Sequence, residues 1–163
     1  LNEKTVEKIE QKSVKTEYGK FNLILYKDLI FDETHLVLQK GKISKNSPTL
    51  VRVQQSNFFH DLLNIDEYGA RWSVSDSMRK INEAGKGIIL LIDGENKKQD
   101  EFQEINASKK KRITAPNNDP RRIGIGSQIL RDLGVKKIKL LGSEVRYPSL
   151  SGFDLEVTEY IKK

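Results

Sequence analysis

The sequence contains no cysteine among its 163 residues. Disulfide bonds, thiolate nucleophiles, iron–sulfur clusters and every zinc site that needs a thiolate ligand are therefore excluded. Histidine is scarce too, because His35 and His60 are the only two, and neither stands at the His-Glu-x-x-His spacing of zinc enzymes. His35 falls in a strand-like pattern, which favours a structural position. His60 and Asp61 are adjacent, but the sequence offers no third ligand near them.

Long apolar runs are absent as well. The longest, Gly87-Ile-Ile-Leu-Leu-Ile92, is far shorter than the roughly 18 residues that a membrane span needs. The N-terminus lacks the apolar region of a signal peptide, so we expect no membrane segment and a cytoplasmic location. The composition, 36% apolar, 32% charged and 7% aromatic, is that of a globular protein on the polar side, and the length fits one domain with a buried core.

Basic residues exceed acidic ones, 29 against 23, which gives a net charge of +6. Much of this surplus lies in residues 96–122. A basic segment attracts phosphate on a nucleotide, a nucleic acid or a membrane surface, although lysines in a loop also serve solubility alone. The run Lys109-Lys-Lys-Arg112 lacks the interleaved aromatic residues of a single-strand platform. Nucleic acid is therefore a disfavoured partner.

The order of patterns predicts an α/β domain with a mixed, largely antiparallel sheet flanked by helices. Residues 1–15 carry alternating lysine and glutamate, which predicts a linker or short solvated helix from a preceding domain, followed by the domain itself over residues 16–163. Strand patterns occur at 21–26, 35–39, 50–53, 87–92, 137–141 and 155–160. We expect the first three of these strands to form an antiparallel meander.

Two amphipathic helices are expected between the later strands. Ser75 is predicted to cap the first and Gly85 to end it, while Gly134 ends the second. The polar stretch 93–119 lacks a sustained apolar period and predicts a mobile loop. Helical or strand periodicity selects the expected core positions: Val74, Met78, Ile81, Ile89, Leu91, Ile125, Ile129, Leu133, Ile138 and Leu140.

Two features near the second helix suggest anion binding. Gly124-Ile-Gly126 is expected to open the helix and could present backbone N–H groups to a phosphate, although glycine at such a junction also serves backbone geometry alone. Asp119-Pro-Arg121-Arg122 places a carboxylate two residues from an arginine. These groups could accept a proton and hold phosphate, or they could simply form a turn and a helix start.

Five segments, in order, resemble landmarks of the GTP cyclohydrolase II family, and the fourth is the most specific. They are Thr16-Glu-Tyr-Gly-Lys-Phe21, Leu50-Val-Arg-Val53, Gly85-Lys-Gly87 with its apolar strand, Ile123-Gly-Ile-Gly-Ser-Gln-Ile-Leu-Arg-Asp-Leu-Gly-Val135 and Lys139-Leu-Leu141. The lysine- and glutamate-rich lead also resembles the junction in bifunctional riboflavin-pathway proteins, where a dihydroxybutanone-phosphate synthase domain precedes the cyclohydrolase. The resemblance implies the family fold, a homodimer and that fused N-terminal partner.

The family reaction opens the imidazole ring of GTP and releases formate and pyrophosphate. It uses a zinc held by three cysteines, with magnesium assisting at the triphosphate. The resemblance places those cysteine positions on Asn57, Tyr68 and Ala70, which offer an amide, a phenol with an ordinary pKa of about 10 and a methyl group. We therefore expect no bound zinc, and magnesium only if a nucleotide binds.

Other positions of the family site are partly kept. The proton-accepting aspartate and the arginine that attacks the α-phosphate fall on Asp119 and Arg121. Arg52 and Glu95 are the remaining substrate-binding positions. The guanine-reading glutamine and the threonine and lysine that close the nucleotide site are replaced by Ser73, Gly142 and Tyr147.

These substitutions leave two hypotheses. The domain is either a degenerate cyclohydrolase that serves as a structural or regulatory dimer partner of a fused synthase, or an active GTP cyclohydrolase with a zinc-independent or altered-metal route. Zinc lowers the pKa of its bound water from 15.7 to about 7, and nothing visible in the sequence replaces it. We therefore favour the first hypothesis, with GTP or phosphate as the ligand that Asp119 and Arg121 would still suit.

Overall fold

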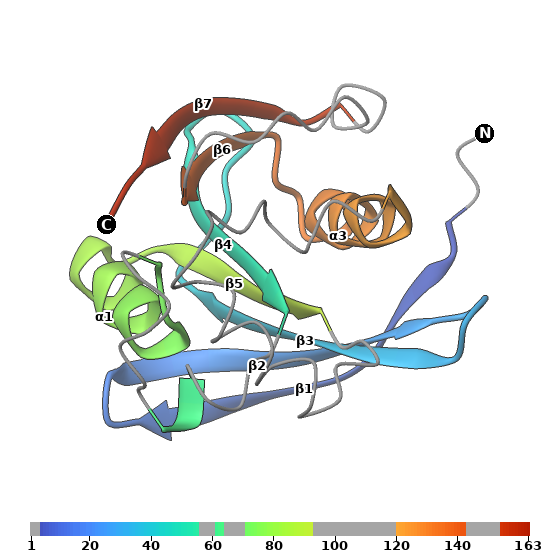
Figure 1. Cartoon of the computed structure of the whole chain (residues 1–163), viewed down its shortest axis with the longest axis horizontal. Coiled ribbons are helices and arrows are strands. Elements are labelled where there is room, and N and C mark those ends of the chain that lie inside the picture. The colour runs from blue at the N-terminus through green and yellow to red at the C-terminus, as the bar shows by residue number, and fades with distance from the viewer. Residues whose placement is uncertain (1–3, 56–60, 64–70, 93–119, 143–153) are drawn as a thin grey trace, which may run out of the picture.

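One sheet organises the described part of the chain. The computed structural model describes residues 4–55, 61–63, 71–92, 120–142 and 154–163, and of residues 120–123 it describes the backbone alone. Helices α1 and α3 pack against the seven-stranded sheet (Figure 1). The elements are β1 (Val6–Thr16), β2 (Gly19–Asp28), β3 (Glu33–Lys40), β4 (Thr49–Gln55), α1 (Val74–Ala84), β5 (Gly87–Ile92), α3 (Pro120–Asp132), β6 (Lys137–Leu141) and β7 (Glu156–Ile161).

The sheet joins an antiparallel half to a parallel half. Its strand order is β1-β2-β3-β5-β4-β6-β7. The pairs along β1-β2-β3-β5 are antiparallel, and the pairs along β5-β4-β6-β7 are parallel. The predicted mixed α/β class is confirmed, but the expected meander ends at β3. β4 departs from it because α1 follows β4 in the chain, and such a crossover allows β4 and β5 to pair in parallel.

The two helices cover opposite faces of the sheet. Ile88 and Leu90 of β5 belong to the apolar cluster that includes the buried side of α3. Ile89, between them, belongs to the cluster with Met78 and Ile81 of α1. Because successive side chains of a strand point to opposite faces, the sheet is the middle layer of three. Burial on both faces explains why β5 is the longest apolar run in the sequence.

The expected core is confirmed. Six of its ten positions are buried, and the other four are partly buried and packed against the two clusters. The buried ones are Met78, Ile81, Ile89, Ile125, Ile129 and Ile138, and the partly buried ones are Val74, Leu91, Leu133 and Leu140. Periodicity therefore selected residues of both faces without showing which helix lies on which face.

The helix ends follow the predicted chemistry with one shift. The N-cap of α1 is Ser73 rather than Ser75, because the Ser73 hydroxyl accepts the backbone N–H of Asp76 at 3.1 Å. Ser75 lies inside the first turn, with its hydroxyl 3.2 Å from that of Ser73. Gly85 and Gly134 follow the two helices with φ angles of 80° and 88°, the left-handed conformation that glycine adopts at little cost.

The N-terminal segment differs from expectation. Val6–Thr16 form strand β1, which pairs with β2 through a single register shift, so these residues are neither a linker nor a solvated helix. Apart from Val6, the residues of β1 are exposed or half-buried. Charged side chains on an edge strand hinder pairing with other chains, which accounts for the alternation of lysine and glutamate. The connection of residues 1–15 to a preceding domain stays a prediction.

Two further expectations concern the polar loop and membrane segments. The loop predicted over residues 93–119 lies outside the described residues. Among the helices that the structure describes, none is long and apolar enough to cross a membrane.

A hydrogen-bonded network ties β2 to the ends of β1 and α3. Tyr26 is fully buried and donates its hydroxyl to Asp132 at 2.6 Å, while Lys4 lies 2.7 Å from the other carboxylate oxygen. Burial, together with the hydrogen bond and charge of Asp132, raises the pKa of Tyr26. Burial alone would raise the pKa of Asp132, but the hydrogen bonds from Lys4 and Tyr26 outweigh it and lower that pKa.

Tyr26→Phe is expected to lower the free energy of unfolding by about 1–2 kcal/mol at neutral pH, because it removes a hydrogen bond to a charged acceptor. Because the pKa of Asp132 is lowered in the folded state, its carboxylate stabilises the fold at pH values above the ordinary pKa of 3.8. This contribution is lost as the pH falls through the folded-state pKa. The difference from wild type should therefore shrink in acid. Urea unfolding at several pH values measures it. Tyr18→Phe, which keeps its ring under the Arg79 guanidinium, is the control.

Two glycines give opposite expectations for the same substitution. A Cβ at Gly87 would lie 2.7 Å from Ile81 Cγ1 and 3.0 Å from the Leu50 carbonyl oxygen. Gly87→Ala should therefore destabilise the fold by about 1–3 kcal/mol through overpacking. A Cβ at Gly124, inside α3, would meet no described atom within 4 Å, so Gly124→Ala should stabilise by about 0.5–1 kcal/mol. Urea unfolding that shows the same sign for both would contradict this packing.

Candidate functional site

Arg52, the predicted substrate-binding arginine, lies on β4 in the parallel half of the sheet. Its Nε donates a hydrogen bond to the Gln54 side-chain oxygen at 2.8 Å. Its Nη1 donates to the backbone carbonyl of Leu141, at the end of β6, at 3.0 Å. Two edges of the guanidinium are thus committed to groups of the protein.

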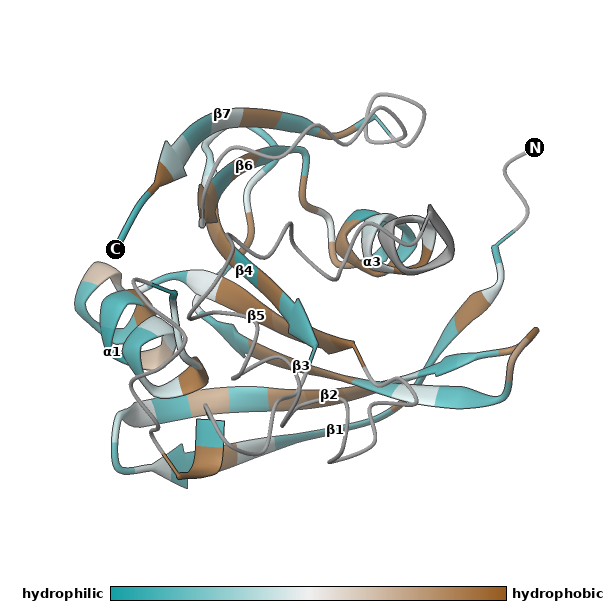
Figure 2. Ribbon diagram, viewed as in Figure 1, coloured by the Kyte–Doolittle hydropathy of each residue, from teal (hydrophilic) through white to brown (hydrophobic). Residues whose placement is uncertain are grey.

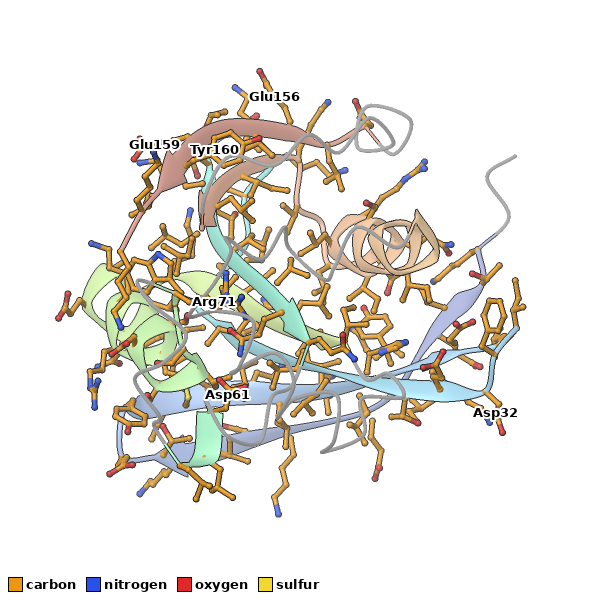
Figure 3. All side chains as sticks on the ribbon, viewed as in Figure 1. Asp32, Asp61, Arg71, Glu156, Glu159 and Tyr160 are labelled. Carbon is orange, nitrogen blue, oxygen red and sulfur yellow. The ribbon has the colours of Figure 1, made fainter. Side chains whose placement is uncertain are left out.

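The Gln54 side chain continues this network toward α1. Gln54 is buried, and its Nε2 donates to both carboxylate oxygens of Asp61, at 2.9 and 3.0 Å. Asp61 Oδ1 lies 3.4 Å from the backbone nitrogen of Val74, the first residue of α1. Figure 3 shows Asp61 near this helix. A carboxylate is favoured there because the N-terminus of a helix carries a partial positive charge.

The central amide connects two opposite charges. Gln54 accepts from the Arg52 guanidinium through its oxygen and donates to Asp61 through its nitrogen. Arg52, Gln54 and Asp61 form what we call the inward network. An arginine that binds substrate phosphate would direct these same donors at the ligand. Here they stabilise the junction of β4, β6 and α1.

Sequence reasoning found one member of the inward network and missed two. Arg52 was singled out because it matches a family position. Gln54 was not singled out, and Asp61 was considered only as a neighbour of His60. The signal that could have found them is the pairing of a buried polar strand residue with an acid near a helix start.

The structure describes two of the replaced family positions. Ser73, in place of the guanine-reading glutamine, caps α1. A Cβ at Gly142, in place of the threonine, would lie 3.4 Å from Arg52 Nη1. This is an ordinary van der Waals distance, so Gly142 lies beside the Arg52 guanidinium without being required to make room for it.

The start of α3 corrects one expectation. α3 begins at Pro120, so Gly124 and Gly126 lie in its interior, beyond the N–H groups that a helix leaves unpaired at its start. The expectation that these glycines present N–H groups to a phosphate is wrong. Arg121 lies in the first turn, where such groups are available.

The remaining predicted site residues lie outside the described part of the chain, and their roles stay predictions. They are Glu95, Asp119 and the family zinc positions Asn57, Tyr68 and Ala70. Within the described ranges, no cluster of three or more histidine or acidic side chains could hold a metal ion.

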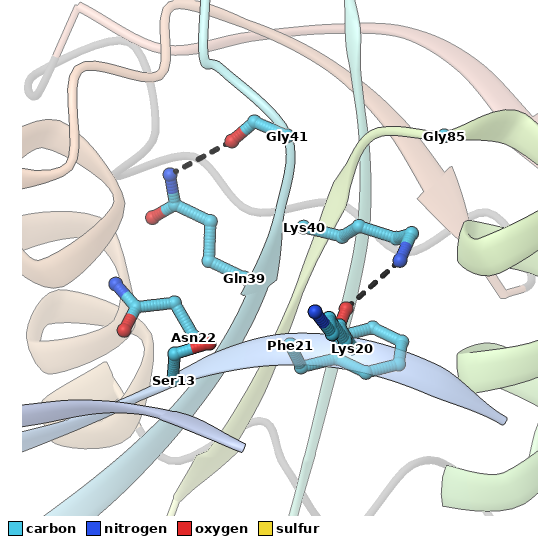
Figure 4. A pocket seen from close by; sticks show the side chains of 8 residues that line it. All are labelled: Ser13, Lys20, Phe21, Asn22, Gln39, Lys40, Gly41 and Gly85. Atoms are coloured by element: carbon cyan, nitrogen blue, oxygen red, sulfur yellow. Dashed lines mark hydrogen bonds between the residues drawn. The ribbon is translucent and has the colours of Figure 1, made fainter. Parts of the chain in front are cut away.

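A separate pocket of about 380 Å³ is lined by residues of β1, β2, β3 and the turns after β3 and α1 (Figure 4). It contains Lys20 and Lys40. The Lys40 ammonium donates to the Lys20 carbonyl at 2.8 Å and lies 5.2 Å from the centre of the Phe21 ring. None of the inward network lines this pocket, and the contacts of Lys40 explain its position without a ligand.

This three-layer α/β domain carries Arg52, which matches a position of the GTP cyclohydrolase II family, in the middle of the parallel strand β4. The model of the family described as GTP cyclohydrolase II matches residues 7–162, and the chain belongs to this family. The family resemblance of the sequence motifs is thereby confirmed.

The chain is similar to longer proteins of riboflavin biosynthesis. It is 40% identical to a 3,4-dihydroxy-2-butanone 4-phosphate synthase of Pseudomonas aeruginosa over 99% of this chain and 44% of that protein. It is 32% identical to the riboflavin biosynthesis protein RibBA of Cytophaga hutchinsonii over 90% of this chain and 39% of that protein.

A solved structure is similar as well. The crystal structure of RibBX, a two-domain 3,4-dihydroxy-2-butanone 4-phosphate synthase from A. baumannii, matches with a TM-score of 0.64 and 33% identity, over 98% of this chain and 41% of that one. The chain thus spans less than half the length of the curated relatives above.

Gln54→Glu tests the inward network. The change is nearly isosteric, but it removes both N–H donors to Asp61 and places two carboxylates at hydrogen-bond distance. We expect a loss of about 1–3 kcal/mol in the free energy of unfolding at neutral pH, partly recovered in acid, where protonation of one carboxyl restores a donor.

Urea unfolding at both pH values measures this effect. Gln39→Glu is the matched control, since Gln39 makes one exposed hydrogen bond of 3.4 Å, to the Gly41 carbonyl. Equal stability of the two variants would argue against the inward network.

Proposed function

We propose that this chain is a degenerate GTP cyclohydrolase II-like domain. In this proposal it does not open the imidazole ring of GTP, and it serves as a structural or regulatory dimer partner of a fused 3,4-dihydroxy-2-butanone 4-phosphate synthase domain. The observation that carries the proposal is the inward network. Arg52 directs its Nε and one Nη1 donor at Gln54 and the Leu141 carbonyl, and we propose that these bonds give it a structural role in place of substrate binding.

The family's zinc does not fit the donor set of this chain. Asn57 offers a neutral amide oxygen, Tyr68 a phenol and Ala70 no donor. Thiolates both bind Zn²⁺ and neutralise its charge, and none of these three groups supplies a thiolate. No hydrolytic step through zinc follows from these residues.

Residual anion binding is compatible with lost catalysis. Arg121 lies in the first turn of α3, where unpaired N–H groups and the helix dipole favour an anion. Asp119 precedes this turn in the sequence. We propose that GTP or phosphate still binds here, with magnesium only as the companion of a nucleotide, while no ring opening follows.

The partner role rests on the relatives. Proteins similar over nearly the whole chain are named as 3,4-dihydroxy-2-butanone 4-phosphate synthases and are more than twice as long. The similar solved structure is that of a two-domain synthase. Both observations support a fused synthase domain, and the homodimer is proposed because a symmetric interface would bring two such domains together.

The second candidate is an active GTP cyclohydrolase that uses another metal or residue set. It is kept because Asp119 and Arg121, the family's proton acceptor and nucleophile, are present. The two candidates differ in whether GTP yields formate.

The decisive measurement is formate release by the fused protein incubated with GTP, magnesium and added zinc. We expect no more formate than from the Asp119→Ala variant, because no thiolate set activates the water. Formate that survives purification and disappears in Asp119→Ala would establish the active alternative. An active GTP cyclohydrolase II assayed in parallel shows that the conditions suffice.

The partner role has its own readout in the same preparation. Synthase activity and sedimentation of the fused protein are compared with those of a version that ends before this domain. Loss of dimer or a several-fold drop in synthase kcat supports the role. An unchanged kcat and oligomeric state would overturn it, whatever the formate assay shows.

A further inference from the structure

The turn between β2 and β3 exposes three consecutive large apolar side chains. Leu29 is 54% exposed, Ile30 65% and Phe31 48%. Turns favour glycine, proline, asparagine, aspartate and serine, so apolar residues are unusual here. Figure 2 shows this apolar turn as brown ribbon at the end of the β2–β3 hairpin. We call Leu29, Ile30 and Phe31 the apolar tip.

The conformation of the tip is fixed by groups outside it. Asp28 Oδ1 accepts the backbone N–H groups of Ile30 and Phe31 at 2.9 and 3.4 Å. Asp32 adopts a φ of 53°, which an aspartate tolerates, and its carboxylate lies 3.0 Å from Lys27. The turn therefore does not need apolar side chains at its three central positions. Adjacent exposed apolar side chains of this kind are a feature of interaction sites.

The tip lies beside the point where the described chain begins. The backbone N–H of Leu29 donates to the carbonyl of Thr5 at 2.8 Å. The Thr5 N–H donates to the Gln128 side chain of α3 at 2.8 Å, and that side chain donates back to the Thr5 hydroxyl at 3.0 Å. With the Lys4–Asp132 ion pair, these bonds hold residues 4–5 against both α3 and the tip (Figure 1).

We propose that the apolar tip docks into an apolar depression on the synthase domain fused before this chain. This inference rests on the proposed function to the extent that such a domain precedes residue 4. A domain joined at this anchored point is held next to the tip at high effective concentration, so a small contact is sufficient to fix its orientation.

The size of the tip favours a tethered partner over a free one. An aromatic side chain such as that of Phe31 presents about 150–250 Å², and Leu29 and Ile30 present less. With each about half exposed, the three offer at most on the order of 300 Å². A stable complex of separate proteins needs at least about 1,000 Å² in total. A second copy or an untethered protein would therefore need much more surface than the tip supplies, whereas a fused domain would not.

Thiol labelling of the fused protein tests the docking. The chain has no cysteine, so Ile30→Cys introduces a single thiol into it. Leu62→Cys is the matched control, because Leu62 is 63% exposed. Maleimide labelling of each peptide is followed by mass spectrometry and normalised to the denatured protein. We expect the thiol at position 30 to react at least about ten-fold more slowly than that at position 62.

A second variant separates docking from chance burial. Adding Leu29→Ser and Phe31→Ser to Ile30→Cys should raise the rate at position 30 to that of the control, because the turn is held by Asp28 and the docking is lost. Rates within two-fold at positions 30 and 62, or protection that survives the two serines, would overturn the proposal. Protection lost on dilution would also overturn it and would assign the tip to a second copy.

The outcome is independent of the formate assay. A fused protein that forms formate but protects position 30 refutes the loss of catalysis and leaves the docking intact. One that forms no formate but leaves position 30 reactive refutes the docking alone.

Discussion

Burial of β5 on both faces is the constraint on which the other elements depend. β5 lies between the antiparallel and parallel halves of the sheet, and its side chains supply both apolar clusters. Each helix can pack only because the strand between them is apolar at every position. Gly87, at its start, admits Ile81 and the Leu50 carbonyl so closely that even a methyl group would collide. The position of α1, and with it the environment of Asp61, follows from that close approach.

The same packing decides what the residual site can do. β4 neighbours β5 and brings Arg52 and Gln54 to the side of the sheet where α1 begins. Arg52 is partly buried, and a guanidinium that is partly removed from water needs acceptors from the protein. The Gln54 amide, the Leu141 carbonyl and indirectly Asp61 meet that need. These contacts are the structural basis of the proposed non-catalytic role of Arg52.

Local patterns predicted the elements well and their partners poorly. The apolar period found six of the seven strands, both helices and the core, because burial of one face leaves a repeat in the sequence. It could not show that β4 pairs in parallel with β5, since pairing direction depends on residues distant in the chain. β1 was missed because an edge strand needs few apolar residues, and Ser73 and Ser75 are equivalent by composition. For the site, Arg52 was found by its motif, whereas Gln54 and Asp61 required knowledge of which polar groups meet.

The strand order also sets the order in which the molecule assembles. β1, β2 and β3 are joined by short turns and pair locally, so these hairpins can form within microseconds. The centre of the sheet needs β5 to pair with β3 and β4 to pair with β6, which brings Val51 to Leu140. Such distant pairings are slow because a long loop must close before any contact rewards it. During synthesis or refolding, the early hairpins therefore display an uncovered apolar face, so the chain is most prone to aggregation before β5 takes its place.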